Sequence, residues 1–293
     1  MRFPIVAVDL AKNTFEVAIV DHGDGQPRFK RFSRGQFERF IANQLASRFV
    51  VEACSMAHFW CRKLAELGHQ PRMLPAQYVT AYRRRNKTDR ADTRALLEAD
   101  RAPDIQAVPV KSAEQQAIQH LHGVRQQLVR ARTNWINQAR AILREQGFVI
   151  AQGANKARHA IPEIIEDADN GLPDALREVL FDIVEQLRGI DERIKRIEHR
   201  LNAYQARDAD AQRISELPGL GLITSTAITS CVTDVRQFSK SRQFPAWLGL
   251  TVAQWICVPL VIFGVVMLIR ERWKPAEPLP EPISVEENAA SEN

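Results

Sequence analysis

Four acidic residues stand at positions where carboxylates could gather around a metal ion. Asp9 ends the apolar run Ile-Val-Ala-Val-Asp, and Glu52 ends the run Phe-Val-Val-Glu. Asp89 and Asp92 are three residues apart, so they would share one face of a helix. Clustered carboxylates repel one another unless a cation neutralises them, and Mg²⁺ prefers oxygen ligands. Because paired Mg²⁺ ions can flank a scissile phosphate, the four acids are candidates for metal-dependent phosphodiester chemistry.

Each acid also has a purely structural explanation. An acid after an apolar strand is often a turn residue or a helix cap, and Asp89 could be such a cap. Asp92 could pair with Arg90 or Arg94 on the protein surface. Only the four acids together, in this order along the chain, favour a metal site.

A compact basic run, Arg83-Arg84-Arg85-Asn86-Lys87, comes just before Asp89. Such runs are commonly solvated surface, but beside a carboxylate cluster this one would suit binding to a phosphate backbone. The net charge of +5 and the pI of about 9.2 favour an anionic partner only mildly.

The elements that would position the acids alternate between strands and helices. Apolar runs predict strands over 5–10, 15–20 and 28–32, then a helix over 35–46, a strand over 48–51, a helix over 57–67, a strand over 70–74 and a helix over 89–99. The order predicts a mixed α/β sheet. If the sheet is RNase H-like, its first strand lies beside the fourth, and Asp9 and Glu52 converge at one edge.

The middle of the chain has the period of long helices. Over 176–201, apolar residues alternate at spacings of four and three, which predicts a coiled coil. Over 113–146 the predicted seam is Leu121, Val124, Leu128, Ala131, Trp135 and Ile142. With the loop at 167–173 between them, the two helices could form an antiparallel hairpin, or the same seam could join two copies of the chain.

The C-terminal part changes character twice. Leu217-Pro-Gly-Leu-Gly-Leu is similar to the turn of a helix-hairpin-helix, although a purely structural helix start explains it equally well. Residues 252–269 are apolar and long enough to cross a bilayer, and the tail 270–293 is acidic, proline-rich and expected to be disordered. The apolar stretch could be a membrane segment of a fused neighbour, a tail without function or a buried helix.

The cysteines and the N-terminus favour a cytoplasmic protein. The four cysteines form no CxxC pair and no zinc-finger spacing with histidine, as expected for free thiols in a reducing compartment. The N-terminus runs directly into a strand-like segment without a long apolar signal core.

Several of these motifs together resemble one protein family. Val8-Asp9-Leu10-Ala11-Lys12, Val51-Glu52-Ala53, Asn86-Lys87-Thr88-Asp89-Arg90-Ala91-Asp92, Leu217–Gly221 and Phe244–Thr251 are similar to motifs of the DEDD transposases of bacterial insertion sequences. These are relatives of a pilin-gene invertase and are now known as bridge-RNA-guided recombinases. The resemblance spans residues 5–251.

The resemblance implies a RuvC-type, RNase H-like catalytic domain over 1–110, a helical coiled-coil region over 111–210 and a partial, mostly α transposase domain over 211–251. It implies Mg²⁺ held by the four acids, DNA as the substrate, a structured noncoding guide RNA, and assembly of dimers or tetramers through the coiled coil. The candidates for binding nucleic acid are Lys12, Arg83, Arg84, Arg85, Lys87 and Arg90.

The chain departs from the family pattern after Thr251. The resemblance implies a nucleophilic serine in a Ser- and Gly-rich stretch beyond that residue, yet no serine occurs before Ser284. We therefore expect a truncated or fused transposase that binds metal and nucleic acid but is impaired in strand exchange. The alternatives are a metal-dependent nuclease or junction resolvase, and a nucleic-acid-binding protein tethered to a membrane by 252–269.

Overall fold

The structure is a computed structural model that describes residues 3–21, 25–83 and 88–233. The expected membrane segment at 252–269, the tail and the Phe244–Thr251 block lie outside these residues. In the described part of the chain, no helix is long and apolar enough to cross a membrane.

The N-terminal part is built on a five-stranded mixed sheet in the order β3-β2-β1-β4-β5. The strands are β1 Ile5–Leu10, β2 Thr14–Val20, β3 Arg28–Ser33, β4 Arg48–Glu52 and β5 Gln70–Leu74. The first three strands run antiparallel to one another, whereas β4 is parallel to both β1 and β5. The predicted mixed sheet is therefore confirmed, including the placement of the first strand beside the fourth.

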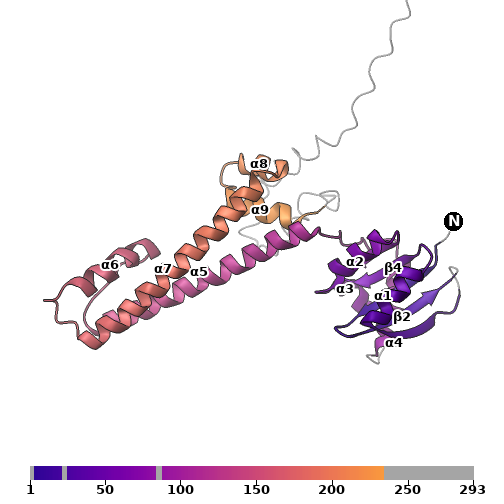
Figure 1. Cartoon of the computed structure of the whole chain (residues 1–293), viewed down its shortest axis with the longest axis horizontal. Coiled ribbons are helices and arrows are strands. Elements are labelled where there is room, and N and C mark those ends of the chain that lie inside the picture. The colour runs from indigo at the N-terminus through magenta and orange to yellow at the C-terminus, as the bar shows by residue number, and fades with distance from the viewer. Residues whose placement is uncertain (1–2, 22–24, 84–87, 234–293) are drawn as a thin grey trace, which may run out of the picture. The chain divides into compact units, whose positions relative to one another are not determined.

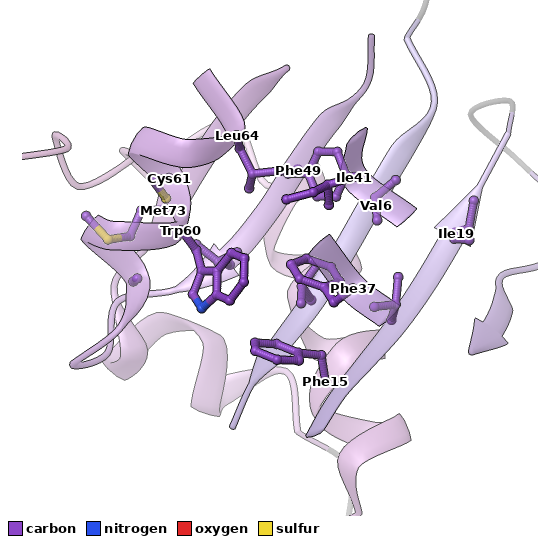
Figure 2. Close-up of a cluster of buried hydrophobic side chains, with 14 residues drawn as sticks. Val6, Phe15, Ile19, Phe37, Ile41, Phe49, Trp60, Cys61, Leu64 and Met73 are labelled. Atoms are coloured by element: carbon purple, nitrogen blue, oxygen red, sulfur yellow. The ribbon is translucent and has the colours of Figure 1, made fainter. Parts of the chain in front are cut away.

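One face of the sheet carries a large aromatic core, packed beneath α1 (Arg34–Asn43) and α2 (Ala57–Glu66). Phe15 stacks on Phe37 with ring centroids 4.8 Å apart, and the edge of Trp60 meets both rings at 5.1 Å (Figure 2). Aromatic pairs at these distances and angles add to the stabilisation that burial alone provides.

The other face of the sheet is made of smaller residues and is covered by α3 (Ala76–Ala81) and α4 (Asp89–Arg101). Ala7 and Ala18 of the sheet are fully buried, as is Ala99 of α4. Small side chains on both elements let the helix backbone come close to the strands. This close packing positions the first turn of α4 beside the end of β1.

Two long helices, α5 (Ala113–Glu145) and α7 (Asp174–Gln205), lie side by side, and α6 (Ala154–Glu166) precedes α7 (Figure 1). Arg125 pairs with Glu198 at 2.8 Å and Arg132 pairs with Asp191 at 3.2 Å, so α5 and α7 run antiparallel. Along α7 the predicted apolar positions from Leu180 to Leu201 are buried within the chain itself.

The predicted seam of α5 is wrong in part. Val124 and Trp135 are exposed by 52% and 38%, whereas Ile136, Ala139 and Leu143 are buried. The apolar face of α5 shifts by one position after Leu128, from the repeat of Leu121 and Leu128 to that of Ile136 and Leu143. The sequence prediction also missed α6, which lies between the two long helices in the chain.

Two short helices follow α7: α8 (Ala209–Ser215) and α9 (Leu222–Cys231). The turn between them contains Gly219 at φ 86°, a conformation that favours glycine. α9 is attached to the long helices by polar contacts as well as by packing. His122 of α5 lies 3.0 Å from the Thr226 hydroxyl, and Gln205 of α7 donates to Ser225 at 3.0 Å.

Candidate active site

Strand geometry brings Asp9 and Glu52 to the same edge and the same face of the sheet. Val8 and Val51 are partners in the parallel pair β1–β4, so the next residues, Asp9 and Glu52, end neighbouring strands. Side chains alternate between faces along a strand. Asp9 therefore shares the face of Ala7, which is the face covered by α4.

The helix α4 supplies the other two acids from its first turn. Thr88 caps this helix, because its hydroxyl accepts a hydrogen bond from the backbone N–H of Ala91 at 3.2 Å. The cap begins the helix at Asp89, so Asp89 and Asp92 both lie in the first turn. The positive end of the helix dipole favours negative charge there. The alternative interpretation that Asp89 is the helix cap is wrong, because Thr88 is the cap residue.

The four acids share one electrostatic environment. The pKa of Asp9 is raised from 3.8 to about 6, first by burial and then by the negative charges of Asp92, Asp89 and Glu52. Arg83 acts in the opposite direction and lowers this pKa. A carboxyl group whose pKa is raised in this way stays partly protonated near neutral pH unless a cation approaches it.

Arg83 is the internal cation of this cluster. Its Nη2 lies 3.3 Å from Glu52 Oε2, and its Nε lies 2.7 Å from Asp92 Oδ1. The guanidinium therefore bridges an acid of the sheet and an acid of α4. Among the described residues, no set of three or more acidic, histidine or cysteine side chains is grouped closely enough to hold a metal ion.

A second charged group adjoins the acids and was missed by the sequence prediction. Glu16 faces Asp9 across the β1–β2 pair and is only 6% exposed. Arg31 pairs with Glu16 at 3.0 Å and also with Asp89, and Arg90 lies 3.5 Å from Glu16. The sequence signal was available, because Glu16 interrupts the apolar side of the run Phe-Glu-Val-Ala-Ile-Val.

The predicted nucleic-acid-binding residues lie in different surroundings. Arg83 and Arg90 contact the acidic groups described above. Lys12 is exposed in the turn after β1 and makes no ion pair with the described residues. Arg84, Arg85 and Lys87 lie outside the described residues.

An open hollow of about 630 Å³ lies beside Asp89 and Glu16. Asp89, Arg31 and Glu16 line it together with Phe29, Thr88 and Arg90. The site thus combines carboxylates, which can hold a hard cation, with guanidinium groups, which can bind phosphate oxygens.

Comparison with known proteins assigns the chain to a family. Residues 6–147 match the family model described as a DEDD transposase, and residues 211–254 match the model of the transposase IS116/IS110/IS902 family. The chain is 37% identical over 255 residues to a probable family 20 transposase of Pseudomonas aeruginosa, an alignment that covers 87% of this chain and 75% of that protein.

Two other relatives are transposases of named insertion sequences. The transposase for IS1111A of Coxiella burnetii is 33% identical over 250 residues, with 85% of this chain and 69% of the relative covered. The transposase for IS1328 of Yersinia enterocolitica is 34% identical over 254 residues, with 86% and 74% covered. The chain therefore belongs to the IS116/IS110/IS902 family of transposases, which are enzymes of DNA transposition.

Proposed function

We propose that the part of the chain over 1–110 is an RNase H-like, RuvC-type domain that cuts a DNA strand with the help of Mg²⁺. The proposal is supported by two observations: Asp9 and Glu52 end neighbouring parallel strands, and the charges of Glu52, Asp89 and Asp92 help to raise the pKa of Asp9. The other domains would be a coiled-coil region over 111–210 and a partial transposase domain over 211–251.

The donor set suits a divalent cation by its chemistry, and the four acids would have to draw closer together around the ion. It consists of carboxylates alone, and the pKa of Asp9 is raised first by burial and then by the negative charges of the other three acids, which Arg83 only partly offsets. Asp9, Glu52, Asp89 and Asp92 would hold the ion, and Arg83 would move away from Glu52 and Asp92 as it binds. The bound metal would activate the attacking oxygen and stabilise the leaving one.

The protein's own residues would orient the DNA strand at this site. Arg31 and Arg90 line the hollow beside Asp89 and could each donate hydrogen bonds to a phosphate oxygen. The basic run at Arg83, Arg84, Arg85 and Lys87, together with Lys12, would add phosphate contacts. A guide RNA would select the target, and the chain would act as a dimer or tetramer.

We further propose that strand exchange is impaired in this chain. The match to the family model ends at residue 254, and residues 252–283 contain no serine. Transfer of a DNA strand through a covalent serine link would therefore lack its nucleophile, while metal and nucleic-acid binding by the N-terminal part would remain.

A circle-junction assay in cells tests this proposal. The chain would be expressed with a donor element and its noncoding RNA, beside an otherwise identical Asp9→Ala variant. We expect no circles from the chain as it stands. We expect circles when the residues from Val252 onward are replaced by a serine-containing segment of a family member, and none when Asp9→Ala is added. Circles from the unaltered chain would overturn the proposed impairment.

The acid cluster also supports a second candidate function, that of a nuclease or junction resolvase that needs no serine. If this is correct, the purified chain should nick branched DNA in Mg²⁺, and Asp9→Asn should abolish the nicking. The absence of nicking by a folded, metal-binding protein would exclude this function.

A further inference from the structure

A second groove, of about 710 Å³, is lined largely by residues of α4. Arg90, Arg94 and Arg101 line it from α4, and Tyr82 lines it from the end of α3. Thr88 and Arg90 line both this groove and the hollow beside Asp89. The groove therefore adjoins the hollow beside Asp89.

The charges in the groove favour an anionic occupant. The charged residues that line it are three arginines and one acid, Glu98. Glu98 lies 3.9 Å from Arg101 at a distance typical of a weak surface pair. Arg94 makes no ion pair with any carboxylate of the described residues, so its charge is not offset by a direct partner.

Arg94 is nevertheless held in place. Its guanidinium lies 5.1 Å from the centre of the Phe29 ring, and that of Arg90 lies 5.7 Å from the same ring. A guanidinium that stacks on an aromatic face still has N–H donors free at its edge. The Phe29 ring thus orders two arginines along the groove while leaving them able to bind phosphate oxygens.

Tyr82 adds a second kind of contact. Its side chain is 40% exposed in the groove, where a flat aromatic ring can stack on a base. Arginines that follow a phosphate backbone, combined with an aromatic ring for the bases, are characteristic of sites for single strands. A groove of this volume is in the range of small-ligand sites, which suits a few nucleotides rather than a duplex.

We propose that the groove formed by Tyr82, Arg90, Arg94 and Arg101 binds a short single-stranded stretch of the DNA substrate next to the bond that is cut. This inference rests on the proposed function, because a strand in the groove would lead toward Asp89 of the proposed active site. The binding itself requires neither metal nor cleavage. Arg94 and Tyr82 contact none of the four acids in the described structure, so their variants leave the acid cluster intact.

The test is binding of the purified full chain to a fluorescent oligodeoxythymidylate in EDTA, measured by anisotropy over a range of salt concentrations. We expect Arg94→Gln to weaken binding about fivefold and to reduce the salt slope by about 0.7, the value for one contact to a single strand. We expect Tyr82→Leu to weaken binding about tenfold with an unchanged slope, because it removes stacking but no charge.

Two matched variants complete the design. Arg39→Gln removes an exposed arginine of α1, which covers the opposite face of the sheet, and should bind as the unaltered chain does. Arg94→Lys keeps the charge and should keep the salt slope. Circular dichroism of each variant establishes that it is folded.

Equal binding by Arg94→Gln and Arg39→Gln would overturn the proposal. Tighter binding of duplex DNA, or of an RNA strand of the same length, with the same sensitivity to Arg94→Gln would overturn the assignment to single-stranded DNA. Because the assay contains no metal, loss of binding in Arg94→Gln would support the groove even if the acid cluster proved unable to cut DNA.

Discussion

At the scale of single residues, charge balance dominates the candidate site. The negative charges of Glu52, Asp89 and Asp92 act on Asp9, and Arg83 partly neutralises this charge. Like charges held together in a folded protein lower its stability, and an added cation relieves the repulsion. This balance leads to two predictions.

The first concerns Asp9 and pH. Because the folded-state pKa of Asp9 is about 6 and its ordinary value is 3.8, the folded protein binds more protons than the unfolded chain between these two values. Stability from this group is present at low pH and is lost as the pH rises toward 6. In EDTA, Asp9→Asn should therefore raise the melting temperature at pH 8, with the gain shrinking at pH 4.5. A gain of equal size at both pH values would contradict the raised pKa.

The second concerns Arg83 and metal affinity. Since its guanidinium bridges Glu52 and Asp92, a metal ion must displace it. Arg83→Gln should tighten Mg²⁺ binding about tenfold in calorimetry, which corresponds to roughly 1.5 kcal/mol for one hydrogen bond to a charged group. Asp92→Asn should weaken Mg²⁺ binding, and Arg39→Gln should leave it unchanged. Weaker Mg²⁺ binding by Arg83→Gln would mean that Arg83 supports the metal site instead of competing for it.

At the scale of elements, the helix pair α5–α7 uses its apolar seam within a single chain. The seam of α7 was also a candidate for joining two copies of the chain. Leu187 and Ile194 of this seam are only 7% and 5% exposed within a single chain. Replacing either with an acid would place an unpaired charge between two packed helices. A change in oligomeric mass after such a substitution would follow from disruption of the hairpin itself.

Ile194→Asp should accordingly destabilise the fold. Burying an unpaired carboxylate and losing the isoleucine should lower the free energy of unfolding by about 3 kcal/mol or more. Urea unfolding followed by circular dichroism measures this change. Arg193→Asp, one residue away on the exposed side of α7, should stay within about 0.5 kcal/mol of the unaltered chain. If both variants unfold at the same urea concentration, Ile194 does not hold the hairpin together.

At the scale of the whole molecule, the family match covers both ends of the described chain. The two models match 6–147 and 211–254, and the long α7 lies between them. The short α8 and α9 begin the second match. α9 packs on α5 and α7 through contacts such as His122 with Thr226, and α8 packs mainly on α9. The helical pair thus serves as a platform for the start of the C-terminal segment.

Much of this molecule follows from local patterns in the sequence. Alternating apolar residues determine the strands, and Pro75 marks the end of β5. The heptad spacing of α7 determines its buried stripe, and the motif around Asp89 and Asp92 indicates the family. These features are readable because each depends on residues close together in the chain.

Other features were decided by tertiary packing alone. The ion pairs of Arg83 with Glu52 and Asp92, and the burial of Glu16 between Arg31 and Arg90, join residues far apart in sequence. The shift of the apolar face on α5 depends on how two long helices pass each other. Neither periodicity nor motif spacing specifies which cation meets which acid, because that depends on where strands and helices place their side chains in space.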